Sequence, residues 1–267
     1  MKRARRLGIA FLLTVTLACL LANVIAPSYA HQFRDEPDAT PSRHHLLGTD
    51  DLGRDRFARV LYGTRVSLLL APAAAFVSSL LAVLIGGTAG FLGGWLERIV
   101  MAATDLFLSL PWLFLLITVR ALLPLNVSPV TSVAITFALL GCLGWAAAAR
   151  VVCADARSLA DSDFILLARA SGSSGLRLLW RQVVPNLRPI VFAQFWISIP
   201  VFILTEANLG VLGLGVAEPL PSWGSLLREL QSYSAITGQP WQFVPLILFV
   251  GVVICFHLVL LDQELSA

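Results

Sequence analysis

Charged residues are scarce in this sequence. Only 13% of the 267 residues are charged and 57% are hydrophobic, whereas a soluble domain has about 25% charged residues. The mean hydropathy of +0.81 leads to the same conclusion. This composition excludes an ordinary water-soluble domain and predicts that most of the chain lies in lipid. Lys2 is the single lysine and the net charge is only +3, so a nucleic-acid partner is not expected either.

Several chemical motifs are missing as well. The four cysteines show no CxxC spacing and are interpreted as buried thiols. The sequence contains no GxxxxGK[ST] phosphate loop and no convergent Ser/His/Asp set. One histidine pair, His44 and His45, lacks the helical spacing of a metal site. We therefore expect no catalytic residue, no metal site and no cofactor bound by this chain.

Six apolar runs are long enough to be membrane spans. A bilayer core of about 30 Å needs roughly 20 apolar residues in a helix, and the runs lack the alternation of barrel strands. The expected spans are residues 7–26, 66–95, 99–119, 130–149, 190–205 and 244–261. The predicted fold class is an all-α membrane protein with six transmembrane helices.

Basic residues predict the orientation of these spans, because cytoplasmic loops are enriched in lysine and arginine. Four basic residues and no acid precede the first span, and six arginines lie in the loop 150–188. Both segments are therefore expected in the cytoplasm, with both termini. The segment 28–65 would then be periplasmic, and its six arginines are matched by six acidic residues.

The expected organisation has four parts: an N-terminal tail and first helix (1–27), a periplasmic loop (28–65), a five-helix core (66–262) with a cytoplasmic loop at 155–188, and a C-terminal tail (263–267). Ser28-Tyr29-Ala30 could instead mark a signal-peptide cleavage site, although the first run is longer than a typical signal core. Within the loop, residues 53–65 place apolar and arginine side chains on different faces, which predicts an amphipathic helix on the membrane surface.

The cytoplasmic loop predicts a short helix. Phe164, Leu167, Ala168 and Ser171 recur at helical spacing, and Gly172 is a suitable helix end. A second short helix would begin near Ser173 or Ser174 and stop before Pro185. The apolar face of the first helix would pack on the chain's own bundle, on the lipid interface or in a groove of a soluble partner.

A few polar or helix-breaking residues stand in or beside the spans. Asp105 fits a helix-to-helix contact or a pathway contact, and Pro111 would kink the same helix. Glu206 precedes a glycine-rich stretch with Gly213 and Gly215, which favours a re-entrant segment with close backbone approach. Trp223 belongs to this segment, either as part of an outer gate or as an anchor in the membrane interface.

Several motifs in order resemble the permeases of ABC importers. Ala168, Gly172 and the run Val183-Val-Pro-Asn186 have the spacing of the cytoplasmic motif of that family. From His45 onward the chain resembles the dipeptide, oligopeptide and nickel branch, through His45-Leu-Leu-Gly-Thr-Asp-Asp-Leu-Gly-Arg-Asp55, Tyr62-Gly-Thr-Arg-Val-Ser-Leu68, Leu212-Gly-Leu-Gly-Val216 and Pro221-Ser-Trp-Gly224.

The resemblance implies a type I permease fold in a bacterial inner membrane and half of a translocation pathway for short peptides. The partners would be a second permease subunit, two ATP-binding subunits that hold ATP and magnesium, and an extracytoplasmic binding protein. The loop helix would be the coupling helix, which seats in the ATP-binding subunit. The residues implied in ATPase coupling are Phe164, Leu166, Leu167, Ala168, Arg169, Gly172 and Pro185. Pathway or gate candidates are Asp105, Pro111, Glu206, Gly213, Gly215 and Trp223.

The sequence departs from the family at one position of the motif. Leu166 stands where the family has an acidic residue, so the charged contact to the ATPase is missing. This departure motivates one alternative to a peptide importer, a degenerate permease or scaffold that binds a partner without transport. A second alternative, open because of the branch that the chain resembles, is a permease for nickel or another small solute. A secondary transporter is disfavoured because few charged residues occur in the spans.

Overall fold

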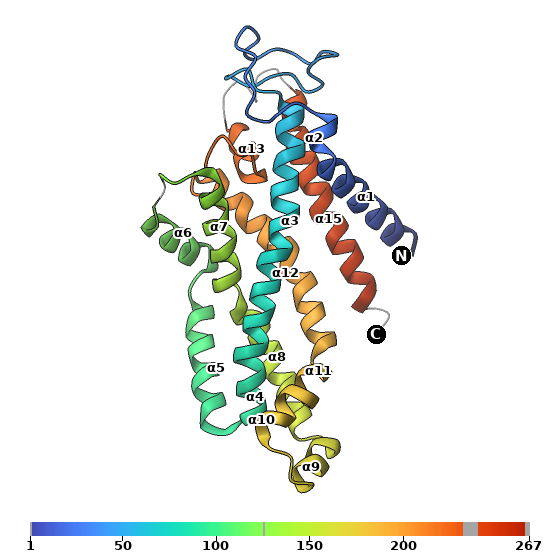
Figure 1. Ribbon diagram of the computed structural model, residues 1–267, viewed down its shortest axis with the longest axis vertical. Coiled ribbons are helices and arrows are strands. Elements are labelled where there is room, and N and C mark those ends of the chain that lie inside the picture. The colour runs from blue at the N-terminus through green and yellow to red at the C-terminus, as the bar shows by residue number, and fades with distance from the viewer. Residues whose placement is uncertain (1, 125, 232–239, 265–267) are drawn as a thin grey trace. The chain divides into compact units, whose positions relative to one another are not determined.

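The computed structural model describes residues 2–124, 126–231 and 240–264 (Figure 1). Over these residues the secondary structure is helical, and pairing between extended segments is limited to the isolated bridges Gln32–Arg54 and Thr49–Asp55. Helices satisfy their own backbone hydrogen bonds, which an apolar chain in lipid requires. The expectation of an all-α membrane protein is confirmed.

Four helical segments among the described residues are long and apolar enough to cross a membrane. They are Arg56–Leu92, Pro129–Ala160, Arg188–Val211 and Pro240–Leu260. A fifth candidate is a bent pair of helices, Gly94–Ser109 and Trp112–Leu122, whose axes differ by 85°. These five agree with the second to sixth expected spans. The first expected span falls on α1 (Lys2–Leu20) and α2 (Ala22–Ile25), which are not among them, so the six-span count and the orientation stay predictions.

The chain divides into two compact units. Unit 1 comprises Met1–Ala71, Arg120–Phe137 and Pro200–Ala267, and unit 2 comprises Pro72–Val119 and Ala138–Ile199. The remaining helices are α3 (Arg56–Ala82), η1 (Val83–Gly87), α4 (Thr88–Leu92), α5 (Gly94–Ser109), α6 (Trp112–Leu122), α7 (Pro129–Leu143), α8 (Trp145–Ala160), α9 (Asp163–Ala170), α10 (Gly175–Leu178), η2 (Leu179–Val183), α11 (Val184–Asn186), α12 (Arg188–Val211), α13 (Trp223–Glu229), η3 (Pro240–Phe243) and α15 (Val244–Glu264).

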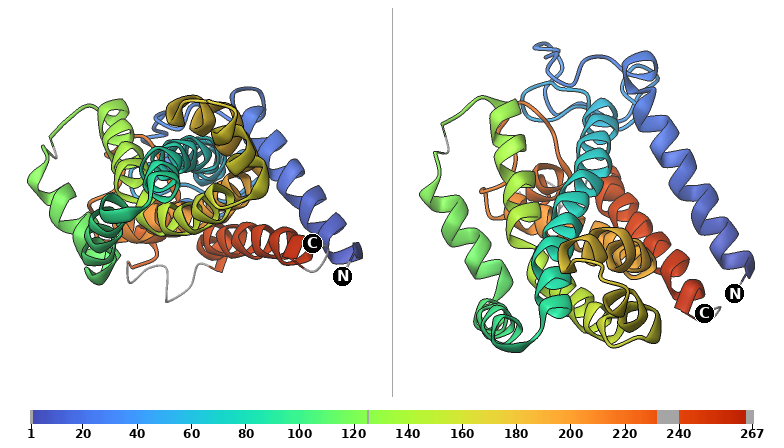
Figure 2. Two further views of the ribbon diagram at one scale, coloured as in Figure 1. Left: turned by 90° about the horizontal axis from the view of Figure 1, so that it is seen from below. Right: turned by 60° about the horizontal axis from the view of Figure 1, so that its bottom comes forward.

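In unit 1 the first and last helices pack side by side. Helices α1 and α15 are neighbours in every view (Figures 1 and 2). Glycines lie where α1 and α15 touch. A Cβ on Gly8 would lie 3.5 Å from the carbonyl oxygen of Cys255, and one on Gly251 would lie 3.3 Å from the ring of Phe11. Such close approach is typical of helix pairs in membranes.

In unit 2 two glycines let η1 and α4 lie directly on α8. A Cβ on Gly86 would lie 2.1 Å from the carbonyl oxygen of Ala149, and one on Gly90 would lie 2.2 Å from that of Cys153. The spacing of the two glycines is the small-xxx-small pattern of close helix contacts. Around this contact a core of buried apolar side chains extends to α9, η2 and α11.

Residues 53–65 do not form a separate surface helix. From Arg56 onward they are the first turns of α3, the helix that becomes the second expected span. Arg59 is fully buried and Arg54 is nearly so, because both guanidinium groups have carboxylate partners inside unit 1. The two arginines therefore take part in ion pairs inside unit 1, and the contact of this stretch with the membrane surface stays a prediction.

Candidate functional site

Helix α9 has defined ends. Ser162 precedes it with an extended backbone, and Asp163 lies in the first turn, where a carboxylate suits the helix dipole. Gly172 follows with a φ of +81°, and its N–H donates to the carbonyl of Arg169 at 3.0 Å while the N–H of Ser173 donates to that of Ala168 at 3.2 Å. These two bonds form a Schellman ending. The prediction that Gly172 ends this helix is confirmed.

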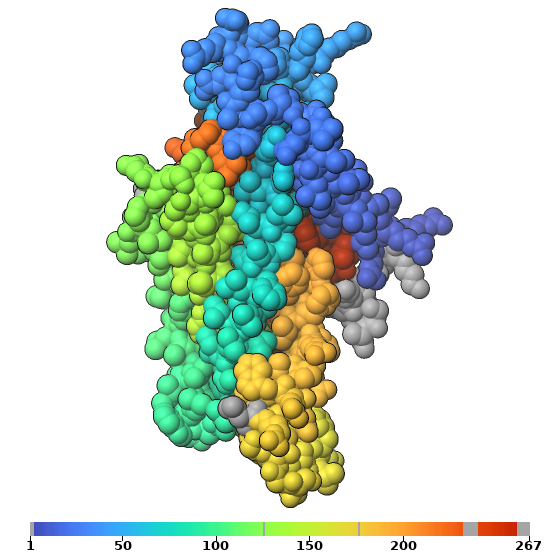
Figure 3. Space-filling model, viewed as in Figure 1, coloured from blue at the N-terminus to red at the C-terminus, as the bar shows by residue number. Residues whose placement is uncertain are grey.

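The two faces of α9 have different surroundings. Ile165 is fully buried in the core of unit 2, and Ala168 packs against that core. On the other side Phe164, Leu166 and Leu167 are 45%, 49% and 73% exposed, and the segment protrudes as the yellow surface in Figure 3. These three apolar side chains thus keep about half or more of their surface exposed, whereas Ala168, an expected coupling residue, packs against the core of unit 2.

Arg169 connects α9 to α4. Its guanidinium carbon lies 5.3 Å from the centroid of the Phe91 ring, within the range of a cation–π interaction. Together with Ile165, this contact fixes α9 on unit 2 from two sides.

The helical segment after α9 continues past Pro185, where the sequence predicted a stop. The π-helical turn η2 runs into α11, and Pro185 lies at the start of α11. A proline is tolerated in a first turn because its missing N–H has no helical acceptor there, and π turns rearrange the neighbouring hydrogen bonds. Pro185 therefore joins two helical turns.

Asp105 and Pro111 both lie in unit 2. Asp105 of α5 forms an ion pair with Arg150 of α8, and both side chains are about half exposed. This contact is the helix-to-helix partner that the sequence suggested. Pro111 lies between α5 and α6 at the 85° break, so the chain has two helices where a kinked one was expected.

Glu206 and Trp223 come together in unit 1. The Ser67 hydroxyl donates to Glu206 Oε2 at 3.1 Å, and Glu206 is fully buried. The Trp223 indole N–H donates to Thr64 Oγ1 at 3.0 Å, and its ring packs edge-on against Phe249 with centroids 5.3 Å apart. Since Trp223 has no exposed surface, the interpretation as an interfacial anchor is wrong.

The glycines after Glu206 pack backbone on backbone. A Cβ on Gly210 would lie 2.3 Å from Cα of Gly224, and one on Gly215 would lie 2.6 Å from Cα of Gly210. Gly213 has a φ of +79°, which favours glycine. The predicted close backbone approach in this segment is therefore present.

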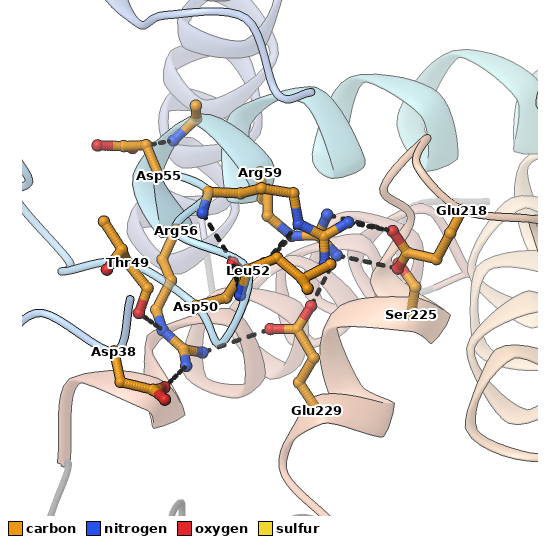
Figure 4. Close-up of polar contacts among 12 residues, drawn as sticks. Asp38, Thr49, Asp50, Leu52, Asp55, Arg56, Arg59, Glu218, Ser225 and Glu229 are labelled. Carbon is orange, nitrogen blue, oxygen red and sulfur yellow. Dashed lines mark hydrogen bonds and ion pairs between the residues drawn. The ribbon is translucent and has the colours of Figure 1, made fainter. Parts of the chain in front are cut away.

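A cluster of buried ion pairs is the feature that the sequence did not predict. We call it the arginine cluster, and it joins residues 50–59 to residues 218–229 within unit 1 (Figure 4). The contacts are Arg54 Nε to Asp50 Oδ2 at 2.6 Å, Arg54 Nη1 to Glu218 Oε2 at 2.6 Å, Arg59 Nη2 to Glu218 Oε1 at 3.1 Å, Arg59 Nη2 to Glu229 Oε1 at 2.7 Å, and Arg56 Nη1 to Glu229 Oε2 at 3.3 Å.

The two glutamates of the arginine cluster have pKa values shifted in opposite directions. Burial acts to raise the pKa of Glu218, but hydrogen bonds and charge from Arg59, and then Arg54, outweigh it and lower this pKa below its usual range. Burial dominates at Glu229 and raises its pKa, against the opposing effect of Arg59. The matched numbers of acids and arginines in residues 28–65 were the one sequence signal for such pairing.

These features define a class of protein. A helical chain with several apolar spans and a loop helix that exposes apolar side chains has the make-up of a multi-pass membrane protein. The chain belongs to the family of binding-protein-dependent transport system inner membrane components, which matches residues 82–263. It is accordingly an ABC-importer permease subunit, a multi-pass inner-membrane protein and not itself an enzyme.

Curated relatives agree with this assignment. The chain is 32% identical to the oligopeptide transport system permease protein OppC of Bacillus subtilis over 90% of this chain and 77% of that protein. It is 30% identical to the dipeptide transport system permease protein DppC of the same organism, over 83% of this chain and 68% of that protein. It is 31% identical to the glutathione transport system permease protein GsiD of Pectobacterium atrosepticum, over 92% and 80%.

Proposed function

We propose that this chain forms half of the translocation pathway of an ATP-driven importer for short peptides and that α9 couples it to an ATP-binding subunit. The names of the three relatives support the peptide class, since they are permeases for oligopeptides, dipeptides and glutathione. A second permease subunit would complete the pathway, two ATP-binding subunits would bind ATP and magnesium, and an extracytoplasmic protein would deliver the peptide.

The proposal places both termini and the loop 150–188 in the cytoplasm. Four basic residues precede α1 without an acid, and the loop carries six arginines, as the positive-inside rule requires. In this orientation α9 faces the side where the ATP-binding subunits are, and the arginine cluster faces the binding protein.

The exposed face of α9 is the observation that carries the coupling role. Phe164, Leu166 and Leu167 form an apolar patch on a short helix whose other side is fixed by Ile165 and Arg169. A rigidly held apolar helix face suits a groove on a partner. Leu166, half exposed in this patch, is consistent with a groove that accepts leucine where other members place an acid.

The ending of α9 gives a test with a matched control. A valine at Gly172 has free space but an unfavourable backbone, because φ is +81°, whereas Gly175 in the same loop has free space and no positive φ. A non-glycine residue in such a conformation costs about 1–3 kcal/mol. In proteoliposomes with both permeases, the ATP-binding subunits and the binding protein, Gly172→Val should lower peptide uptake per ATP hydrolysed about tenfold. Gly175→Val should leave it unchanged.

The outcomes separate the alternatives. Unchanged uptake by Gly172→Val, with the protein inserted normally, would rule out α9 as the coupling helix. Assembly with the ATP-binding subunits but no uptake of any peptide by the wild type would support the scaffold alternative. Leu166→Glu should preserve assembly if the groove is of the usual kind, and a loss of assembly would show that the groove has adapted to leucine.

A further inference from the structure

Unit 1 contains a cavity of about 380 Å³ beside the glycine-rich segment, and several charged side chains line it. Its volume lies within the range of roughly 300–1,000 Å³ that is typical of small-ligand sites. The residues used below are Arg120, Ser132, Gly213, Glu218, Arg228 and Glu229, all of which line it.

Arg120 is a buried cation for which the described residues provide no carboxylate partner. Its side chain is 1% exposed, and its guanidinium donates to Ser132 Oγ at 3.1 Å and to the Pro124 carbonyl at 3.4 Å. Its Nε has no hydrogen-bond partner. Within the described part of the chain no carboxylate lies within the 4.0 Å of an ion pair. Burying an unpaired charge is costly, so an anion from outside the chain would stabilise Arg120 in this position.

Ser132 holds the Arg120 head group in place. Its hydroxyl oxygen accepts from Arg120 and from the backbone N–H of Ala217 at 3.1 Å, and its hydroxyl donates to the Gly215 carbonyl at 3.3 Å. The guanidinium is therefore fixed to the glycine-rich segment, as a preorganised binding group would be.

Arg228 adds a second cation to the wall. It is exposed and, within the described residues, forms no ion pair. Its guanidinium lies directly against Gly213, since a Cβ there would be 3.0 Å from Nη1. The carboxylates on the same wall, Glu218 and Glu229, are engaged by arginines of the arginine cluster. Two guanidinium groups without a carboxylate partner among the described residues thus line the cavity, that of Arg228 exposed and that of Arg120 almost completely covered by its neighbours, whereas both carboxylates of the wall are paired.

We infer that this cavity is an anion-binding subsite in the pathway and takes the carboxylate of the transported solute, which for a short peptide is its C-terminal carboxylate. The inference rests on the proposed function. Guanidinium groups bind carboxylates through paired, charge-assisted hydrogen bonds. Arg120 would make the main contact because it is buried and oriented, and Arg228, near the opening, would make a weaker one.

The test compares trialanine with its C-terminal amide in proteoliposomes that contain the complete transporter. The same binding protein is used throughout, so a change in the uptake ratio of free acid to amide arises in the permease. Arg120→Met should lower this ratio about tenfold, as expected for the loss of a charged hydrogen bond. Arg120→Lys should recover part of it and Arg228→Met should lower it less. Arg43→Met, an exposed loop arginine, should leave it unchanged.

A second measurement avoids the binding protein. Trialanine should raise the Tm of the purified permease and ATP-binding complex, its amide should not, and Arg120→Met and Arg228→Met should both reduce the shift. If the variants had the same uptake ratio of free acid to amide and the same rise in Tm with trialanine as the wild type, the subsite would be overturned. Peptide uptake by the same complexes would still support the proposed function. A shift with sodium phosphate at matched ionic strength, and none with trialanine, would assign the cavity to inorganic anions and overturn the solute assignment. Failure of the wild type to take up either peptide would instead reject the proposed function.

Discussion

Among the described residues both units contain ion pairs between segments, but only in unit 1 is the arginine of such a pair fully buried, and its partner Glu218 is half exposed. Arg59 has no exposed surface and lies 2.7 Å from Glu229 and 3.1 Å from Glu218. In unit 2 the Arg157 side chain pairs with Glu97 at 2.9 Å while it is 65% exposed. An arginine–glutamate pair is therefore expected to contribute differently to stability in the two units.

This difference shows how each unit is held together. In unit 1 the ion pairs of Arg59 join residues that are more than 150 positions apart in sequence. Removal of Arg59 would leave Glu218 with Arg54 and Glu229 with Arg56 as their remaining partners. In unit 2 the helices pack closely at Gly86 and Gly90. Exposed ion pairs are expected to add little to the stability of this unit. Unit 1 combines charge pairing with close backbone contacts at Gly210 and Gly215, whereas unit 2 depends mainly on such contacts.

The largest effect should follow from Arg59→Met. This substitution leaves Glu218 and Glu229 without their common partner, and breaking a buried pair in this way costs about 3–5 kcal/mol. We expect a marked fall in the Tm of the purified transporter complex. Arg43→Met, at an exposed arginine of the same loop, should leave the Tm unchanged.

A double variant tests the cause of this loss. Arg59→Met combined with Glu229→Leu should recover part of the lost stability, because it removes the more buried of the two carboxylates that lose Arg59. If Arg59→Met had the same Tm as the wild type, water would solvate Glu218 and Glu229 in the variant. The expected difference in stability between the ion pairs of the two units would then be contradicted.

Gly90→Ala should have the next largest effect. The added methyl group would lie 2.2 Å from the Cys153 carbonyl oxygen, so α4 and α8 must separate at a cost of about 1–3 kcal/mol. The better helix propensity of alanine, about 1 kcal/mol, opposes this loss without cancelling it. The Tm of the complex measures the balance.

Gly175→Ala is the matched control for Gly90→Ala. Gly175 has no neighbouring atom within 4 Å of an added Cβ, so only helix propensity changes, and the Tm should stay the same or rise slightly. A rise in Tm with Gly90→Ala would contradict the close packing of η1 and α4 on α8.

Features encoded by neighbouring residues could be predicted from the sequence. The lengths of uncharged runs indicated five of the helical spans, because a bilayer sets a minimum length. The helical spacing from Phe164 to Ser171, followed by Gly172, predicted α9 and its ending. A Schellman ending needs a residue with a left-handed backbone after the helix, and glycine adopts that conformation readily. Family motifs then indicated what that helix does.

Features that depend on tertiary contacts could not be predicted. Nothing in the order of residues pairs Arg59 with Glu218, so the arginines of α3 were assigned to the membrane surface instead of the interior. Trp223 has the composition of an interfacial anchor, yet its hydrogen bond to Thr64 and its contact with Phe249 bury it. Arg120 belongs to the same class, since a single arginine at the end of an apolar run does not reveal a cavity.

The smallest effect should follow from Arg157→Gln, which breaks the exposed pair with Glu97. Exposed pairs contribute about 0.2–1 kcal/mol, so the Tm should fall slightly at low salt. At about 1 M salt the Debye length is near 3 Å, and this small difference from the wild type should vanish. The deficit of Arg59→Met should be larger and less sensitive to salt, because the Arg59 side chain has no exposed surface. Equal salt sensitivity of the two variants would show that burial does not distinguish the ion pairs of the two units.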